Sequence, residues 1–242
     1  MTHNMVVIKL VCYYILIMKQ VSVILPCLNE EDGVGIAIEK ILNVFQNNSI
    51  DGEIIVVDNG STDNTKVITL EYPVVYLYES KRGYGNAYKA GFAQATGQHV
   101  IMGDPDSSYD FNEIPKFLKL LETNDVVLGS RFSGVMEEGA MPFLHRYVGN
   151  PGILFLFRVL YGLKLTEPST GFVGLRNDII PTLNLKQPGM EFSSEVLVRV
   201  KQNNYLLHET PINYHRRSGT SKLRTFRDGF RHLWFLLKTK WA

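Results

Sequence analysis

The chain has 242 residues, of which 45% are hydrophobic and 20% are charged. This length and composition suit one large α/β domain with a sizeable buried core. The formal net charge of +1 excludes a global basic field of the kind that attracts nucleic acid, but it leaves a local basic patch open. Cys12 and Cys27 are far apart and lack metal-site spacing. We therefore expect neither a zinc site nor a disulfide scaffold, and a reducing, cytoplasmic compartment.

Residues 5–18 form a mostly apolar stretch that Lys9 interrupts. The stretch is too short to span a bilayer as a helix, and no small-residue cleavage site of a signal peptide follows it. An extra strand, a peripheral helix and a stretch upstream of the true start are the open alternatives. We predict an N-terminal extension over 1–20, a main domain over 21–223 and a basic amphipathic segment over 224–242.

Five short apolar runs alternate with helical patterns in the first half of the chain. The runs cover residues 21–26, 53–58, 74–78, 98–102 and 125–128. Short apolar runs rich in β-branched residues are typical of buried parallel strands. Strands that alternate with helices at these intervals predict a Rossmann-like, mainly parallel sheet with helices on both faces.

Polar and glycine-rich segments predict where the intervening helices begin. Residues 29–32 supply capping and acidic side chains, so we expect them to begin the first helix. Asp63 should cap the second helix, and the glycine-punctuated loop 82–85 should open the third. A fourth helix is expected over 110–121.

The second half of the chain has a different pattern. Residues 145–163 are strongly apolar, and a helix near 191–201 precedes a strand near 205–214. A basic segment closes the chain, and its apolar residues recur at roughly helical spacing.

Polar side chains follow four of the predicted strands at the points where they end. These residues are Asn29, Glu30, Asp58, Asp104, Asp106, Ser130 and Arg131. In parallel sheets, ligands bind beyond the carboxyl ends of the strands. The convergence of four polar strand ends therefore predicts a binding site at this edge.

The strongest signal among them is Asp104-Pro105-Asp106. Two carboxylates in an extended turn can reach a common cation, and Mg²⁺ or Mn²⁺ prefers such oxygen ligands. The cation would neutralise a leaving diphosphate. A solvated loop with two capping acids is the alternative for an isolated pair of this kind.

Each of the other strand-end residues has two alternative roles, one in ligand binding and one in local structure. Asp58 could accept hydrogen bonds from a nucleobase, and Asn29 and Glu30 could bind base or ribose hydroxyls; turn and cap chemistry is the alternative. Arg82 and Gly83 bring a cation and a close backbone approach to the same edge.

Arg131 and Glu167 also have two readings each. Arg131 could pair with phosphate, or it could form an internal ion pair with a nearby acid. Glu167 is a candidate base or acceptor-site carboxylate, with a surface acid as the alternative.

The closing segment carries many basic side chains against the single acid Asp228. The basic residues are Arg216, Arg217, Lys222, Arg224, Arg227 and Arg231. Interleaved with apolar and aromatic residues, they indicate a helix on an anionic membrane surface. A docking helix with a solvated basic face is the alternative. A nucleic-acid patch is also open, but no recognisable RNA-binding fold accompanies it, so we expect no nucleic-acid partner.

Three segments of the chain together resemble the family 2 glycosyltransferases, whose fold is GT-A. They are Val21-Ser22-Val23-Ile24-Leu25-Pro26-Cys27-Leu28-Asn29-Glu30, then 56–63, then 103–106. Residues 103–111, 189–192 and 216–223 narrow the likeness to the polyprenyl-phosphate glycosyltransferases of the dolichyl-phosphate mannosyltransferase type.

The resemblance implies roles for particular positions. Pro26, Leu28, Asn29, Glu30, Asp58, Arg82, Gly83, Asp104, Pro105, Arg131 and Lys222 would bind the nucleotide sugar. Asp104 and Asp106 would hold the metal, with Ser108 as a further ligand. Arg146, Arg217 and Lys222 would seat the acceptor phosphate, and Asp106, Arg131 and Glu167 would be catalytic. Ser108 stands where the mannosyltransferases have an amide-bearing residue, and Glu167 where Asp is frequent.

The expected reaction is an inverting transfer of a hexose from a UDP- or GDP-sugar to a polyprenyl or dolichyl phosphate. Many such relatives continue into transmembrane helices, whereas this chain stops at Ala242; we expect it to be peripheral at the cytoplasmic face of the membrane. Transfer to a glycan or other hydroxyl is the runner-up, with Glu167 or Glu191 as the base.

Two functions other than glycosyl transfer stay open as alternatives. A nucleotidyltransferase would be expected to carry a glycine-rich, Arg- or Lys-bearing loop after the first strand, and this chain lacks one. The second alternative is a nucleotide-binding protein with the same fold that has no catalytic activity. The sequence leaves the oligomeric state open.

Overall fold

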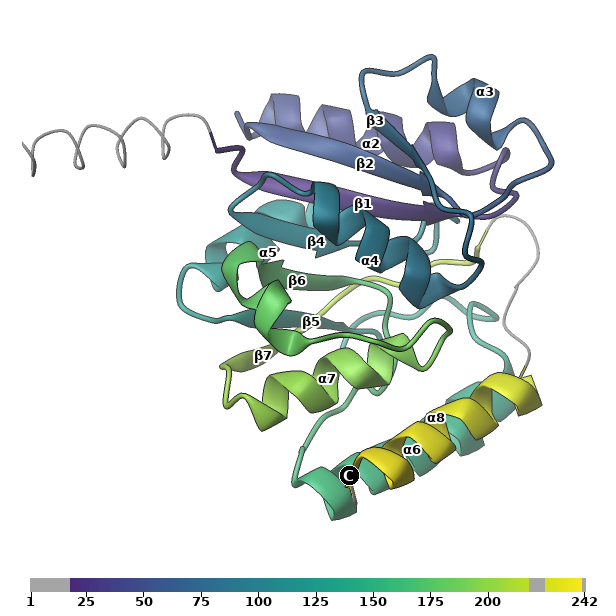
Figure 1. The fold of residues 1–242 in the computed structure, drawn as a ribbon, viewed down its shortest axis with the longest axis vertical. Helices are drawn as coiled ribbons and strands as arrows, with labels where there is room; N and C mark the ends of the chain where they lie inside the picture. The colour runs from purple at the N-terminus through teal and green to yellow at the C-terminus, as the bar shows by residue number, and fades with distance from the viewer. Residues whose placement is uncertain (1–17, 218–224, 241–242) are drawn as a thin grey trace, which may run out of the picture.

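The computed structural model describes residues 18–217 and 225–240, with side chains from Arg227 onward in the second range. In these ranges a seven-stranded sheet lies between helices (Figure 1). The strands are β1 (Val21–Cys27), β2 (Gly52–Asp58), β3 (Val75–Tyr78), β4 (His99–Met102), β5 (Val126–Ser130), β6 (Val173–Arg176) and β7 (Leu207–Pro211). The α-helices are α2 (Val34–Asn47), α3 (Thr65–Thr69), α4 (Tyr84–Gln94), α5 (Ile114–Leu121), α6 (Asn150–Tyr161), α7 (Phe192–Gln202) and α8 (Thr225–Lys240).

The prediction of a Rossmann-like, mainly parallel sheet is confirmed. The strand order is β3-β2-β1-β4-β6-β5-β7. Strands β1 to β4 pair in parallel, as do β5 and β7. The carboxyl ends of these parallel strands face one edge, as the alternation of strands and helices predicted.

Strand β6 is an element that the sequence did not predict. It is four residues long and runs antiparallel to both β4 and β5. Its reversed direction means that the chain enters β6 at the carboxyl edge of its neighbours. The preceding loop, 166–172, is therefore placed beside the ends of β4 and β5, where the sequence alone could not locate it.

The core forms on both faces of the sheet because successive strand residues point to opposite sides. In β1, Ile24 packs with α4 and α7 residues, whereas Val23 and Leu25 pack with α2 and α5 residues. All three side chains are buried. These two apolar layers hold the strand ends in fixed positions.

The predicted start of the first helix is wrong. Helix α2 begins at Val34 after Gly33, with no side-chain cap and no acid in its first turn. Instead, the amides of Gly33 and Val34 donate to the carbonyl of Glu30, because residues 29–31 bind the 61–65 loop. Asp63 is not the N-cap of α3: that position is Asn64, which makes no side-chain cap, and Asp63, one residue earlier, accepts the Thr65 amide on its Oδ1 at 3.1 Å.

Helices α6 and α8 lie side by side below the sheet (Figure 1). A π-helical turn, His145–Gly149, leads into α6. The Tyr161 hydroxyl at the end of α6 donates to the Leu236 carbonyl of α8 at 2.6 Å. Among the described residues, no helix combines the length and the apolar character that a bilayer span requires.

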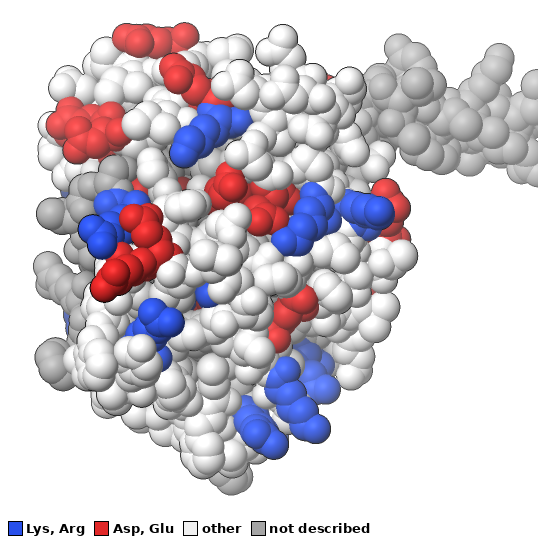
Figure 2. All heavy atoms as spheres, turned by 180° about the vertical axis from the view of Figure 1, so that it is seen from behind, with Lys and Arg blue, Asp and Glu red and all other residues white. Residues whose placement is uncertain are grey.

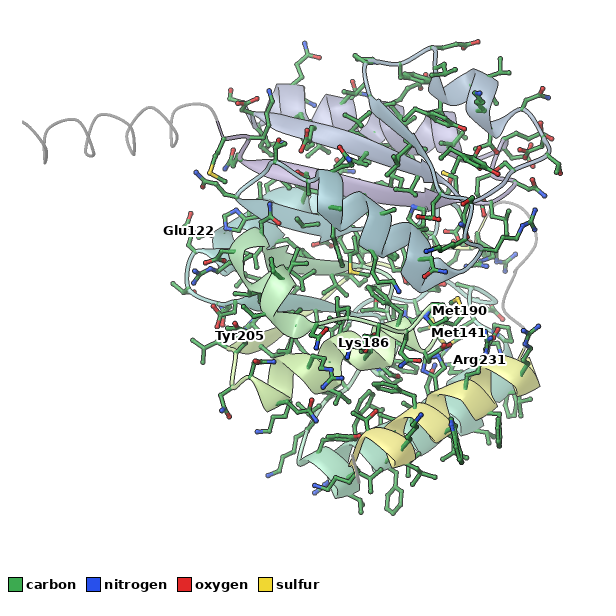
Figure 3. All side chains as sticks on the ribbon, in the orientation of Figure 1. Glu122, Met141, Lys186, Met190, Tyr205 and Arg231 are labelled. Carbon is green, nitrogen blue, oxygen red and sulfur yellow. The ribbon has the colours of Figure 1, made fainter. Side chains whose placement is uncertain are left out.

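Helix α8 is attached to the domain through a buried polar contact. His232 is 5% exposed, and its Nδ1 lies 2.7 Å from the Ser194 hydroxyl of α7. Arg231 points from α8 toward the loop that carries Met190 (Figure 3), where a Cβ on Gly189 would lie 2.7 Å from its Nη1. Residues 1–17 and 218–224 lie outside the described ranges, so the proposed division at residues 20 and 223 stays a prediction.

Burial lowers the pKa of His232 to about 4, against the opposing charges of Glu191 and Asp228. The unfolded chain takes up this proton near pH 6.5. Stability from the neutral ring is thus complete above pH 6.5 and is lost as pH falls toward 4. We expect the melting temperature of the wild type to fall more steeply over this interval than that of His232→Asn, as circular dichroism would measure. Parallel pH profiles would contradict this assignment.

Candidate active site

The polar strand ends converge at the carboxyl edge of the sheet. Asp104 and Asp106 follow β4, Asp58 ends β2, and Arg131 follows β5. The loop before β6 adds Glu167 between them. The structure therefore brings together residues from four separate parts of the chain.

Asp106 is 5% exposed, and its two oxygens have different surroundings. Oδ1 accepts the Ser108 amide at 3.0 Å and the Ser108 hydroxyl. Oδ2 forms an ion pair with Nη2 of Arg217 at 2.6 Å. The protein thus orients this carboxylate through Ser108 and places a cation on its other oxygen.

Asp104 lies in a closely packed setting beside Asp106. The Tyr84 hydroxyl at the start of α4 donates to Oδ1 at 3.2 Å. A Cβ on Gly171 would lie 2.4 Å from Oδ2, so only glycine permits this approach. Burial, and then the negative charge of Asp106, raises the pKa of Asp104 to about 7.

This pair fits a divalent cation. Two adjacent buried carboxylates bind a positive charge favourably, and Arg217 already supplies one at Asp106. Their donors are oxygens, the ligands that Mg²⁺ and Mn²⁺ prefer. In the described ranges no group of three or more His, Cys, Asp or Glu side chains could hold a metal, so the substrate and water would supply the other ligands.

Arg131 and Glu167 form a buried, two-pronged ion pair. Nε of Arg131 lies 2.8 Å from Oε2 of Glu167, and Nη2 lies 2.6 Å from Oε1. The Arg131 amide donates to Oε2 as well, at 3.2 Å. The internal ion pair is therefore the reading that the structure bears out for Arg131, and Glu167 is fully buried rather than a surface acid.

Neighbouring groups fix this pair in place. The Tyr214 ring lies 5.2 Å from the Arg131 guanidinium carbon. The Ser169 amide donates to Oε1 of Glu167 at 2.9 Å. Glu209 of β7 accepts the Thr166 and Glu167 amides at 3.0 Å, which anchors the loop before β6.

Two of the predicted nucleoside-binding residues, Asn29 and Glu30, lie together after β1, against the loop that follows β2. The Asn29 amide donates to the Ser61 hydroxyl at 2.9 Å, and the Glu30 amide donates to Thr65 Oγ1 at 2.8 Å. The negative charge of Glu30 contributes to the raised pKa of Asp104. Glu30 thus connects the surroundings of Asp104 with the start of α3.

Asp58 performs turn chemistry in this structure. It is 3% exposed, and its Oδ1 accepts the amides of Gly60 and Ser61 at 3.1 and 2.8 Å. Its Oδ2 accepts the Tyr76 hydroxyl at 2.8 Å. Contact between Asp58 and a base stays a prediction.

The loop that begins α4 also forms hydrogen bonds with other parts of the protein. The Gly83 amide donates to Asn59 Oδ1 at 2.6 Å, and Arg82 donates to the Gly60 carbonyl at 3.0 Å. Gly83 has a φ of 140°, and a Cβ there would lie 2.1 Å from the Pro188 carbonyl oxygen. Glycine is therefore required where this loop meets the one before α7.

Of the three residues predicted to bind the acceptor phosphate, the structure places one at the two aspartates. Arg217 lies on Asp106, whereas Arg146 lies in the π-helical turn over the Tyr147 ring at 5.5 Å. Lys222 falls outside the described residues. The roles predicted for Pro26, Leu28, Pro105 and Ser108 toward ligands likewise stay predictions.

The sequence reasoning missed three residues that shape the site: Tyr84, Tyr109 and Gly171. The Tyr109 hydroxyl accepts the Gly171 amide at 2.7 Å, which holds the loop before β6 against Asp104. Tyr84 and Tyr109 both lie within motifs that the sequence singled out, yet nothing in a linear motif tells which of its side chains points inward.

Comparison with known proteins agrees with this geometry. The profile of Glycosyl transferase family 2 matches residues 22–183. The chain belongs to glycosyl transferase family 2. The resemblance found in the sequence is thereby confirmed.

Two curated relatives resemble most of the chain. The low-salt glycan biosynthesis hexosyltransferase Agl6 of Haloferax volcanii is 37% identical over 218 residues, which are 89% of this chain and 52% of the relative. The dolichol-phosphate mannosyltransferase of Pyrococcus furiosus is 28% identical over 90% of this chain and 64% of its own. The chain thus spans less than two thirds of either relative.

Solved structures share the GT-A fold of this family 2 chain. Glucosyl-3-phosphoglycerate synthase of Mycobacterium tuberculosis, in complex with Mn²⁺, UDP and glucosyl-3-phosphoglycerate, superposes with a TM-score of 0.70. The match covers 92% of this chain and 80% of that one at 20% identity. The expected fold class is therefore confirmed.

Replacement of Glu167 by glutamine tests the buried ion pair. The variant leaves the Arg131 charge buried without its counter-charge, so we expect it to lower the free energy of unfolding by about 3–5 kcal/mol. Asp178→Asn makes the same chemical change in the exposed Arg176–Asp178 pair and should cost less than about 1 kcal/mol. Urea unfolding measures both, and equal losses would contradict the structural importance of the buried pair.

Proposed function

We propose that this family 2 glycosyltransferase transfers a hexose from a UDP- or GDP-sugar to a polyprenyl phosphate, with Mg²⁺ or Mn²⁺ as cofactor. The observation that carries the proposal is the pair of adjacent carboxylates, Asp104 and Asp106, at the carboxyl edge of the sheet with a guanidinium on Asp106. The metal and UDP in the related synthase structure support it.

In the proposed reaction, different residues bind the cation, orient its ligands and bind the nucleoside. A divalent cation on Asp104 and Asp106 would neutralise charge on the departing diphosphate. Ser108 and Tyr84 hold the two carboxylates in position. Asn29 and Glu30 would bind the nucleoside beside them. Because these groups are fixed before the substrate arrives, their electrostatic effect requires little reorganisation.

The state of Glu167 favours a phosphate acceptor over a hydroxyl acceptor. A hydroxyl needs a base to take its proton, whereas a phosphate near neutral pH is already anionic. Both oxygens of Glu167 are occupied by Arg131 and by the Ser169 amide, so this residue is poorly placed as a base. Glu191, 5% exposed with Oε2 lacking a hydrogen bond to the described residues, stays the candidate base for the alternative hydroxyl acceptor.

An exposed apolar surface on α6, α8 and the preceding turn supports a membrane-bound acceptor. We call it the two-helix face. It comprises Leu144, Tyr147, Val148, Phe155 and Val159 with Phe230, Leu233, Trp234 and Leu237, all exposed. Basic side chains of the same helices are Arg146, Arg158, Arg227, Arg231, Lys238 and Lys240.

The charge on this part of the molecule suits an anionic lipid surface. Toward the bottom of Figure 2, the end at which α6 and α8 lie in Figure 1, the surface is mainly uncharged and its charged side chains are mainly basic. Asp228, the acid of α8, is buried. We propose that the two-helix face rests on the membrane that holds the polyprenyl phosphate.

Release of nucleoside diphosphate tests the reaction. With a panel of UDP- and GDP-hexoses, a polyprenyl phosphate and Mn²⁺, we expect turnover that excess chelator abolishes. Asp106→Ala should lower the rate at least about 100-fold, because charge stabilisation of a leaving group is worth several kcal/mol. Asp178→Asn, on the exposed Arg176 pair, should leave the rate unchanged. Full turnover in chelator would exclude the metal mechanism.

Vesicle sedimentation tests the two-helix face. The double variant Phe230→Ser, Trp234→Ser removes two side chains that are 65% and 60% exposed, so we expect at least about tenfold weaker binding to vesicles rich in phosphatidylglycerol. Val67→Ser, Leu70→Ser, in α3 and at its C-cap, is the matched control, since both side chains are 60% exposed at the other end of the molecule (Figure 1). Equal binding by both variants would overturn the membrane assignment.

A further inference from the structure

Arg217 is joined to the oxygen of Asp106 that is directed away from Ser108. Ser108 takes Oδ1 through its amide and hydroxyl, and Arg217 Nη2 lies 2.6 Å from Oδ2. The charge of Arg217 also acts on Asp104, whose pKa it lowers against the larger effects of burial and Asp106. One guanidinium thus offsets the repulsion between the two carboxylates.

The backbone before Arg217 holds this contact in place. The His215 amide donates to the Ser108 carbonyl at 2.9 Å, and Tyr214 forms a β-bridge with Tyr109. The Arg216 amide donates to Glu137 Oε2 at 3.0 Å, and its Nε donates to the Glu138 carbonyl at 2.7 Å. Residues 214–216 are therefore fastened beside the loop that carries Asp106, so Arg217 reaches Oδ2 from a fixed position.

We propose that Arg217 is a built-in competitor for the metal: it occupies Asp106 Oδ2 and must leave that oxygen when a divalent cation binds. A cation that bridges Asp104 and Asp106 needs an oxygen from each, and Oδ1 of Asp106 is held by Ser108. The arriving cation and the guanidinium would otherwise be like charges on one oxygen. This inference rests on the proposed function, because it takes the pair as the metal site.

Displacement gives Arg217 a second position. The Arg217 side chain is 32% exposed, so it can turn toward solvent without breaking the core. Once released, the guanidinium is free to pair with an anion, and a phosphate is the anion that the proposed reaction brings to this edge. Metal loading would then precede, and promote, binding of the acceptor phosphate.

Manganese binding tests the competition directly. Electron paramagnetic resonance measures free Mn²⁺ with the wild type, Arg217→Gln and Arg216→Gln, each alone and with UDP or GDP. We expect Arg217→Gln to bind Mn²⁺ at least about fivefold more tightly than the wild type, since loss of a partly buried ion pair frees the carboxylate. Arg216→Gln removes the same charge one residue away, keeps the bond from the residue 216 amide to Glu137 and the His215 amide bond to Ser108, and should change the affinity less than about twofold.

The outcomes separate this inference from the proposed function. If the wild type and both variants bind Mn²⁺ equally, Arg217 does not compete, and the metal site stands. If Arg217→Gln binds Mn²⁺ more weakly, Arg217 supports the metal site rather than opposing it, and the inference is overturned. If none of the proteins binds Mn²⁺ even with nucleotide, the proposed metal-dependent function itself fails. Thermal melting of each variant confirms that the comparison is made on folded protein.

Discussion

The site depends on the mutual repulsion of two carboxylates at the end of one strand. Asp104 and Asp106 are separated by one residue in the chain, and burial with their shared charge raises the pKa of Asp104 to about 7. Such a pair is costly unless positive charge lies nearby. Arg217 supplies that charge at Asp106, and the hydrogen bonds from Ser108 to Asp106 and from Tyr84 to Asp104 stabilise the two carboxylates further. Even Gly171 belongs to it, because any side chain there would displace Asp104.

A second buried charge, Arg131, is balanced within the protein rather than left for a ligand. Its pairing with Glu167 satisfies both oxygens of the carboxylate. This pairing bears on the chemistry that the site can support, because both oxygens of Glu167 already accept hydrogen bonds from Arg131 and the Ser169 amide. The pairing follows from the antiparallel direction of β6, because the chain enters that strand beside the end of β5 and so places Glu167, in the loop before β6, next to Arg131.

The two stretches of chain that leave the site lead to the same surface. After Arg131 the chain continues to the π-helical turn and α6, and after Arg217 it continues to α8. These helices pack together and expose the two-helix face. We propose that the phosphate acceptor approaches Asp104 and Asp106 from this surface.

The sequence by itself determined the parallel strands, the helices between them and the edge at which their polar ends meet. The prediction of these elements was correct because apolar periodicity and the polar residues at strand ends are local features of a few neighbouring residues. It also found Asp104, Asp106, Arg131, Glu167 and Arg217, since each lies in or near a motif. The tertiary structure alone decided how these residues pair. Arg131 meets Glu167 across 36 positions, and Arg217 meets Asp106 across more than a hundred. Such contacts follow from the direction of β6 and the packing of residues 214–216, which depend on the whole sheet and leave no local signal in the chain.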